Sequence, residues 1–281
     1  MPLLFRCVLI ACVCTLLAGA ADHPGNHECL NATLWAQTAV EHDGAYLQAY
    51  RLARIQLDRA LKDKHWTAAI EQTGKFSKLP PAIILDIDET VLDNTPGQAR
   101  VIFKDSDFIP ALWDQWVSES AARPLPGAVE LTQYARSRGV TVFFVTNRSK
   151  AQEDATRKNL EAAGFPLTPA KGPLTDTILC RSAGETDKKT RREQIVPHYR
   201  VLLLFGDDLG DFMPDVDKTV EERRKMAAPY LDRVGVQWIM LPNAMYGSWD
   251  RAVLNSEKPS TRDAKLDLKF RSLQPSGSAK P

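Results

Sequence analysis

Several stretches of the chain consist almost entirely of apolar residues and end abruptly at polar ones. The clearest are residues 82–85, 140–145 and 201–205, and weaker runs occupy residues 177–180 and 236–241. A short apolar run of this kind is typical of a strand that is covered on both faces, as in a parallel sheet. The sequence therefore predicts five buried strands.

Between these runs, apolar residues recur at helical spacing. Residues 30–75 predict two helices or one broken helix, and residues 127–138 and 151–163 predict one amphipathic helix each. A further short helix is expected at the basic cluster 188–192. Strands that alternate with helices indicate an α/β fold, a doubly wound (Rossmann-like) parallel sheet with helices on both faces.

The first 20 residues have the pattern of a secretory signal peptide. Arg6 precedes a nearly uncharged run, residues 7–17, and Ala18-Gly19-Ala20 offers a small-residue cleavage site. The run is short for a membrane span, so we expect export to the periplasm or the medium and no transmembrane segment in the mature chain. A second route stays open, because residues 9–12 resemble a lipoprotein box ending at Cys12. Few apolar residues precede Cys12, so lipid anchoring is less favoured.

Residues 96–123 are interpreted as an insertion above the strand ends, bounded by turn signals on both sides. Together with the N-terminal helices and C-terminal segments, they predict a small, mainly helical cap lobe. The predicted organisation is a signal peptide at 1–20, a domain at 21–255 whose core spans about 80–95 and 124–245, and a polar tail at 256–281.

Charge and cysteine content exclude some functions. The chain has 36 Lys and Arg against 35 Asp and Glu, a formal net charge of +1. No overall attraction to a nucleic acid polymer is therefore expected. Cys29 and Cys180 remain once the signal peptide is removed, but two distant cysteines do not specify a disulfide. Pairing and two separate thiols both stay open.

Acidic residues follow two of the predicted strands. Asp86 and Asp88 come directly after residues 82–85, and Asp207 with Asp211 follows residues 201–205. Carboxyl ends of strands lie side by side in a doubly wound sheet. Two adjacent carboxylates are costly unless a cation or a proton intervenes, and Mg²⁺ takes oxygen ligands. The alternative is that Asp86 and Asp88 merely cap a loop or helix.

A bound cation at this edge would attract a phosphate. The oxygens of that phosphate need donors, which Thr146, Asn147 and a lysine could supply after the strand at 140–145. Positioning and charge neutralisation provide most of the catalysis in phosphoryl transfer, and a carboxylate can itself be the nucleophile. The pattern thus favours phosphoryl transfer through an aspartyl phosphate.

Four motifs in order resemble those of the haloacid dehalogenase superfamily: Asp86-x-Asp88-x-Thr90, Thr146, Lys188, and Gly206-Asp207 followed by Asp211. A finer resemblance, from about residue 35 to residue 249, is to class C acid phosphatases, which include the lipoprotein e(P4) 5'-nucleotidases. It is carried by LDIDETVLDN at 85–94, WDQWV at 113–117, PGAVE at 126–130, FVTNR at 144–148, GDDLGDF at 206–212 and LPNAMYGSW at 241–249.

The resemblance implies a role for each matching residue. Asp86 would be the nucleophile and Asp88 the general acid and base. Mg²⁺ would be held by the Asp86 side chain, the Asp88 main-chain carbonyl and Asp207, with Asp211 supporting the metal or its waters. Thr146 and Lys188 would bind phosphoryl oxygens, and Trp113 and Tyr246 would sandwich a nucleoside base or another flat leaving group.

Some of these residues have a structural alternative. Lys188 lies beside Lys189, and such a charge run is often a solvated face, but the family pattern favours Lys188. Trp113 and Trp116, three residues apart, could form one stripe that faces the core. Asp93 and Asp208 are interpreted as loop or cap residues.

The sequence predicts an exported, Mg²⁺-dependent acid phosphatase that hydrolyses small phosphomonoesters, 5'-nucleotides by resemblance. One alternative is a phosphotransferase, in which another alcohol replaces water. Another is a low-turnover secreted binding or storage protein on the same fold. The presence of Asp86, Asp88, Thr146 and Asp207 argues against the last alternative, because a pure binding protein does not need both Asp86 and Asp88. The resemblance also implies that a homodimer could form.

Overall fold

The computed structural model describes residues 27–167 and 174–275. The predicted signal peptide and the cleavage and lipidation sites therefore lie outside the described residues. Within the described ranges, none of the helices combines the length and the apolar character needed to cross a membrane.

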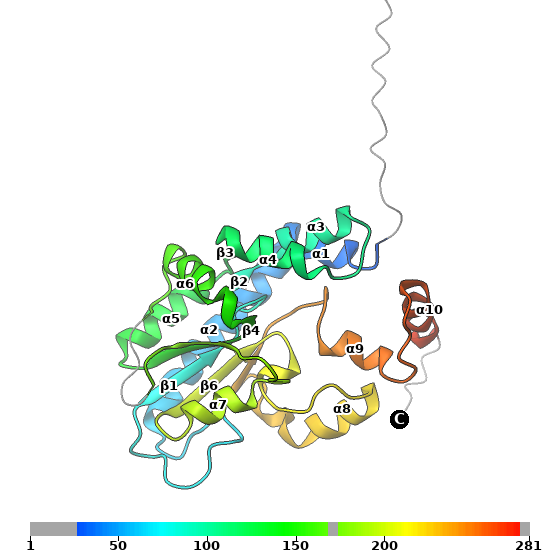
Figure 1. Ribbon diagram of the computed structural model, residues 1–281. Helices are drawn as coiled ribbons and strands as arrows, with labels where there is room; N and C mark the ends of the chain where they lie inside the picture. The colour runs from blue at the N-terminus through cyan, green and yellow to red at the C-terminus, as the bar shows by residue number, and fades with distance from the viewer. Residues whose placement is uncertain (1–26, 168–173, 276–281) are drawn as a thin grey trace, which may run out of the picture.

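A five-stranded parallel sheet lies at the centre of the protein, in the order β5-β4-β1-β6-β7 (Figure 1). The chain builds outward from β1 in one direction and then returns to add β6 and β7 on the other side. The order of strands thus reverses between β1 and β6, the place where doubly wound sheets bind ligands. The strands are β1 (Pro81–Leu85), β4 (Thr141–Ser149), β5 (Ile178–Arg181), β6 (Arg200–Gly206) and β7 (Trp238–Met240).

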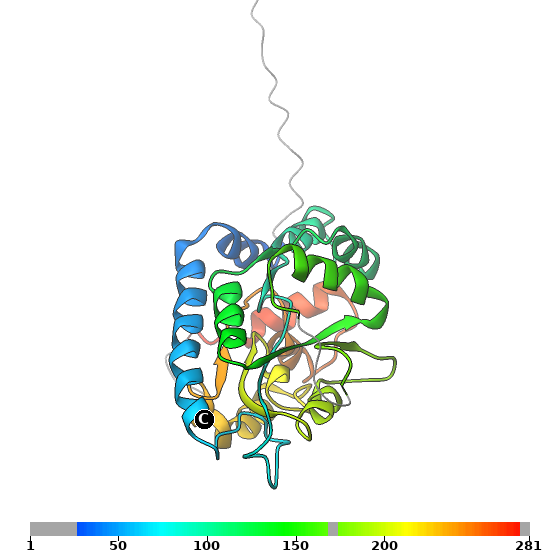
Figure 2. The same cartoon turned by 90° about the vertical axis from the view of Figure 1, so that its left-hand side faces the viewer.

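Side chains of the central strands alternate between two apolar cores, as the period of a strand requires. In β1, Ile83 and Leu85 enter one core, whereas Ala82 and Ile84 enter the other. Both faces of the sheet are therefore covered, and the predicted doubly wound α/β fold is confirmed. The first core is closed by α2 (Val40–Lys62), α5 (Ala128–Ser137) and α6 (Glu153–Ala162), of which α2 and α5 run side by side in Figure 2, and α7 (Lys189–Ile195) closes the second.

A helical layer lies beyond the carboxyl ends of the strands (Figure 1). It consists of α1 (Leu30–Thr38), α3 (Thr95–Phe103) and α4 (Pro110–Glu119). The insertion that carries α3 and α4 is closed at its base by β2 (Leu92–Asp93), which pairs with β3 (Arg123–Pro124) in antiparallel fashion. Where α3 meets α4, a Cβ on Gly97 would lie 2.8 Å from the Trp116 ring, so these helices pack very closely.

The C-terminal part adds three helices. They are α8 (Val220–Ala227), α9 (Ser248–Leu254) and α10 (Arg262–Ser272). Elsewhere along the chain, short 3-10 helices are formed by η1 (Lys150–Gln152), η2 (Leu209–Asp211) and η3 (Ala228–Arg233). Helix α10 falls in the segment predicted as a polar tail. Its sequence lacks the apolar stripe that predicts a helix, since Leu268 is its buried residue. Arg262 and Lys265 form ion pairs with Glu28, Asp105 and Asp107.

Three element boundaries differ from the prediction. Helix α2 ends at Lys62, and the apolar residues after it pack against the sheet from turns; Trp66, for example, donates a hydrogen bond to Leu202 O at 2.7 Å. Strand β4 continues to Ser149, because its polar end still pairs with β5 through an irregular register. Strand β7 is limited to three residues.

Cys29 and Cys180 do not form a disulfide; both are free thiols. The Cys29 thiol donates to Met245 O at 3.3 Å, whereas Cys180 is buried in β5. Burial is the main reason that the pKa of Cys29 rises to about 11 and the pKa of Cys180 to about 12. The open question of pairing is therefore answered in favour of separate thiols.

Candidate active site

Three carboxyl groups meet at the carboxyl ends of β1 and β6. Asp86 directly follows β1, Asp207 directly follows β6, and Asp211 ends η2. One oxygen from each lies within 4.8 Å of the others. Buried carboxylates this close repel one another unless a cation lies between them, and hard divalent cations prefer such oxygen ligands. The donor set therefore fits a Mg²⁺-type ion.

The pKa values of these acids reflect the same crowding. Burial, followed by the charges of Asp211 and Asp86, raises the pKa of Asp207 well above its ordinary range. Burial also raises the pKa of Asp86 to about 7, although Lys188 acts in the opposite direction. Without a cation, the cluster thus resists full ionisation at neutral pH.

Lys188 reaches into this acid cluster. Its buried Nζ forms an ion pair with Asp86 and a second with Asp211 Oδ1 at 2.6 Å. Burial disfavours its charge, but Asp211 and Asp86 outweigh burial and raise the pKa of Lys188. Lys189 instead pairs with Glu193 on the exposed side of α7, at 3.8 Å. Of the two lysines, the structure places Lys188 beside the predicted nucleophile.

Asp211 is held in place from several sides. Its Oδ2 accepts a hydrogen bond from Asp208 N at 3.0 Å, and a Cβ on Gly206 would lie only 2.0 Å from the same oxygen. Only glycine at position 206 leaves room for this carboxylate. Arg192 supports the main-chain oxygen of Asp211 at 3.0 Å and forms a buried ion pair with Glu71 at 2.7 Å.

The loop that carries Asp88 is tied to α2. The Tyr50 hydroxyl donates to Thr90 O at 2.6 Å, and the Tyr46 hydroxyl donates to Glu89 O. Glu89 has a φ of 52° in the left-handed region, and burial raises its pKa well above the usual range. Tyr46 and Tyr50 are both buried, so the two tyrosines of α2 anchor this loop from inside the core.

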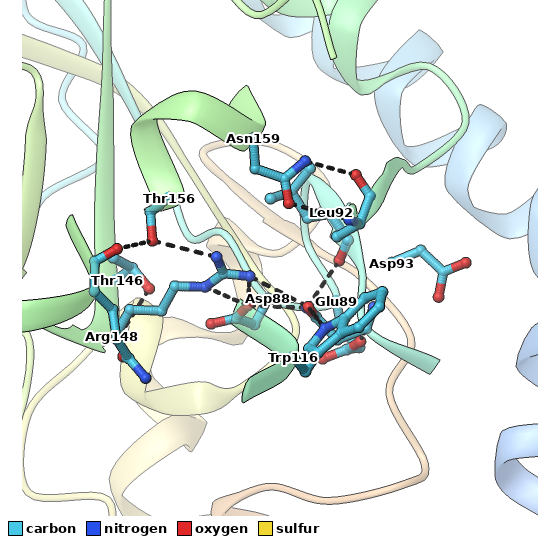
Figure 3. A network of polar contacts seen from close by, with 12 residues as sticks. Asp88, Glu89, Leu92, Asp93, Trp116, Thr146, Arg148, Thr156 and Asn159 are labelled. Carbon is cyan, nitrogen blue, oxygen red and sulfur yellow. Dashed lines mark hydrogen bonds and ion pairs between the residues drawn. The ribbon is translucent and has the colours of Figure 1, made fainter. Parts of the chain in front are cut away.

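Asp88 belongs to a network of polar contacts (Figure 3). Its Oδ1 accepts hydrogen bonds from Arg148 Nε at 2.9 Å and from Asn94 Nδ2 at 2.9 Å. The sequence pattern did not single out Arg148 or Asn94. Arg148 follows an apolar strand, but its burial and its acidic partner are visible only in the fold.

The predicted phosphate-binding residues follow the apolar part of β4. Thr146 is buried, and its Oγ1 accepts a hydrogen bond from Arg148 N at 3.1 Å. Asn147 is exposed, and its Oδ1 accepts a hydrogen bond from Arg191 at 2.9 Å. Arg191 also donates to Thr146 O, which fixes this end of the strand.

The two tryptophans of α4 have different surroundings. Trp116 is buried, and its Nε1 donates to Asn94 Oδ1 at 2.8 Å. Trp113 is only half-buried, with its ring centroid 5.6 Å from the Arg148 guanidinium carbon. Tyr246 is 37% exposed in the loop after β7. Among the described residues, the Trp113 and Tyr246 rings make no contact with each other.

Of the two acids interpreted as loop or cap residues, Asp93 ends β2 and Asp208 is the N-cap of η2. Asp93 accepts from Thr95 N at 2.9 Å at the start of α3. Asp208 caps η2, accepting from Gly210 N at 2.8 Å, and also accepts from the Ser248 hydroxyl at 2.7 Å. Neither has an oxygen in the three-acid cluster.

The chain is similar to several characterised or solved proteins. It is 34% identical to the class C acid phosphatase of Bacillus anthracis, with a TM-score of 0.75 over 88% of this chain and 96% of that one. It is 29% identical to the class B acid phosphatase of Morganella morganii over 52% of this chain, and 29% identical to the stem 31 kDa glycoprotein of Glycine max over 47%. The chain spans 63% and 52% of the lengths of these last two relatives.

A family model matches most of the chain. It describes subfamily IIIB of the HAD superfamily, the acid phosphatases, and covers residues 20–249. This range includes the whole sheet, the helical layer and every residue of the acid cluster. The chain therefore belongs to the HAD superfamily, subfamily IIIB (acid phosphatase).

Proposed function

We propose that this protein is an exported, Mg²⁺-dependent acid phosphatase that hydrolyses small phosphomonoesters, 5'-nucleotides among them, through an aspartyl phosphate. The observation that carries this proposal is the position of Asp86, which touches Lys188 and lies in one cluster with Asp207 and Asp211. A carboxylate nucleophile beside a fixed cation and a metal-type acid cluster suits phosphoryl transfer.

The reaction has two steps. In the first, an Asp86 carboxylate oxygen attacks phosphorus, the bond from phosphorus to the leaving oxygen breaks, and Asp88 gives that oxygen its proton. The products are an alcohol and an aspartyl phosphate. In the second, water attacks phosphorus and gives its proton to Asp88, while the bond to Asp86 breaks. Inorganic phosphate leaves, and both carboxyl groups return to their starting state.

The other residues bind charge. Thr146, Asn147 and Lys188 are proposed to hold the phosphoryl oxygens. Mg²⁺, held by Asp86, the Asp88 carbonyl, Asp207 and Asp211, would neutralise the charge of the transferred group. A further support is that a second structure of the Bacillus anthracis enzyme, 34% identical with a TM-score of 0.76, has tungstate bound, a tetrahedral oxyanion like phosphate.

Recognition of the leaving group is assigned to two aromatic residues. Trp113 and Tyr246 both keep part of their rings accessible and come from segments that flank the strand ends. Stacking of a nucleoside base between them would contribute about 1 to 3 kcal/mol per base. The proposal of export is based on the signal-peptide pattern of residues 1–20. The proposal of a homodimer is based on the resemblance to class C acid phosphatases.

The test is hydrolysis of a phosphomonoester panel that includes several 5'-nucleotides, by purified residues 21–281. Turnover should require Mg²⁺, stop on addition of EDTA and be lost in Asp86→Asn. Asp58→Asn is the matched control, because this acid forms a surface ion pair with Arg138 at 2.8 Å, away from the cluster. Its activity should equal that of the wild type. If the wild type stays inactive at every pH, a binding or storage role replaces the proposal.

A further inference from the structure

Asp88 is held by a network that also reaches the helical layer (Figure 3). We propose that Arg148 and Asn94 are positioning residues that fix Asp88 for proton transfer. We also propose that Trp116 connects Arg148 and Asn94 to α4, the helix that carries Trp113. The inference rests on the proposed function, since it assigns the parts that orient the acid and base of that reaction.

The hydrogen bonds to the Asp88 carboxyl group all go to one of its two oxygens, Oδ1. Oδ1 accepts from Arg148 NH2 at 2.8 Å, from Arg148 Nε at 2.9 Å and from Asn94 Nδ2 at 2.9 Å. Within the described ranges, no hydrogen bond reaches Oδ2. Both guanidinium N–H groups donate to the same oxygen, and these charge-assisted hydrogen bonds fix the position of Oδ1. One oxygen is thus held, and the other is left for proton transfer.

Arg148 is a rigid support rather than a residue that reaches substrate. Its side chain is 1% exposed, against 16% for Asp88. NH1 donates to Thr156 Oγ1 at 3.2 Å, and Thr156 in turn donates to Gln152 O at 2.8 Å at the start of α6. The guanidinium group is therefore fixed by β4 and α6. If Asp88 turned away, the guanidinium group could not follow it.

Asn94 joins this support to α4. Its Nδ2 donates to Asp88, while its Oδ1 accepts from Trp116 Nε1 at 2.8 Å and from Arg148 NH2 at 3.2 Å. Trp116 lies three residues after Trp113 on α4, so the two side chains are neighbours on the helix surface. The Arg148 guanidinium also lies 5.6 Å from the Trp113 ring centroid. A leaving group that contacts Trp113 can therefore influence the positions of Arg148 and Asn94, the residues that orient Asp88.

A purely structural role for Arg148 gives a different expectation. A buried counter-ion affects all substrates alike, because it acts on the fold. A positioning residue acts through Asp88, and proton donation matters more as the leaving oxygen becomes more basic. p-Nitrophenolate leaves readily without a proton, phenolate less so, and an alkoxide hardly at all.

The experiment measures kcat/KM of residues 21–281 on p-nitrophenyl, phenyl and benzyl phosphate, which are leaving groups of similar size. Arg148→Gln should lose at least about tenfold more on benzyl phosphate than on p-nitrophenyl phosphate, within the range of general acid catalysis. Trp116→Phe keeps the ring and removes only the N–H, so it should show a smaller loss with the same trend.

Arg200→Gln is the matched control. This buried arginine lies at the amino end of β6, opposite the acid cluster, and donates to main-chain oxygens there. Its loss should lower the melting temperature and leave the ratio of the three kcat/KM values unchanged. A trend in Arg200→Gln equal to that in Arg148→Gln would overturn the inference.

A double-mutant cycle separates action through Asp88 from action on the fold. In an Asp88→Asn background, Arg148→Gln should change kcat/KM for phenyl phosphate by less than about twofold, because interacting residues are not additive. Equal losses on all three substrates, or full additivity, would overturn the inference. Failure of the proposed function looks different: the wild type would be inactive, or indifferent to Asp86→Asn.

Discussion

Single residues in the acid cluster are under electrostatic strain that a bound cation would relieve. Asp207 accepts hydrogen bonds from Thr90 at 3.2 Å and from Asn243 at 2.8 Å, and these donors compensate only part of the cost of its charge. Its pKa remains well above the usual value because of burial, Asp211 and Asp86. The cluster thus favours metal binding at the expense of the stability of the metal-free protein.

Asp207→Asn should therefore stabilise the metal-free protein and abolish stabilisation by Mg²⁺. The gain should grow as the pH rises above the ordinary aspartate value toward the raised pKa of Asp207 in the folded protein. It should disappear below the ordinary aspartate value of 3.8, where the unfolded carboxyl is protonated too. Each kcal/mol corresponds to about 2 to 4 °C in melting temperature for a domain of this size. Thermal unfolding with EDTA and with Mg²⁺ measures both effects, and an unchanged response to Mg²⁺ would count against Asp207 as a ligand.

Gly206→Ala tests how Asp211 is seated. The added methyl group would collide with the Asp211 carboxylate at 2.0 Å, so the main chain or Asp211 must move. We expect loss of metal-dependent activity and a lower melting temperature. Gly44→Ala is the control, because nothing lies within 4 Å of its Cβ position in α2. It should stabilise the helix by about 0.5 to 1 kcal/mol and leave activity intact. Full activity in Gly206→Ala would contradict the close packing.

At the scale of elements, local patterns predicted the strands better than the helix ends. Strand β1 was predicted because its residues are apolar on both faces, and both faces are covered. Residues 63–75 were expected to be helical because their apolar residues are also spaced to face one side. Those residues form turns instead and pack against the sheet. Their structure is decided by tertiary contacts, which the local spacing of apolar residues does not encode.

For the site residues too, local patterns in the sequence predicted only what is local. Asp86, Asp88 and Asp207 were predicted because each follows an apolar strand. Arg148 and Asn94 were not predicted, since their importance comes from contacts across 60 and 6 positions of the chain that only the fold creates.

Helix α10 shows what ionic attachment contributes. Arg262 pairs with Glu28 before α1 at 2.8 Å and with Asp105 after α3 at 2.7 Å. Arg262→Ala should speed hydrogen exchange in α10 and leave phosphatase activity unchanged. Partly exposed pairs contribute about 0.2 to 1 kcal/mol each, so global stability should fall little. Lys225→Ala, which removes a pair within α8, is the control and should leave α10 exchange unchanged. Equal α10 exchange in both variants would show that apolar contacts hold the helix.

For the whole molecule, the reversal of strand order decides where chemistry occurs. Strands β1 and β6 meet there, and each ends in an acid of the cluster. The helical layer lies beyond the same strand ends (Figure 1). The proposed catalytic and recognition residues come from segments far apart in sequence and are thus gathered at one end of the sheet.

The fold reaches this arrangement without a disulfide between its two described cysteines, and this is testable in residues 21–281. Native protein should react slowly with iodoacetamide, because the pKa values of Cys29 and Cys180 are about 11 and about 12 and little thiolate exists at neutral pH. Unfolded protein should yield two thiols, and a reducing agent should leave the melting temperature unchanged. Cys29→Ser should retain one thiol after unfolding. A wild-type protein that yields none, and melts lower when reduced, would mean that the two cysteines pair in solution.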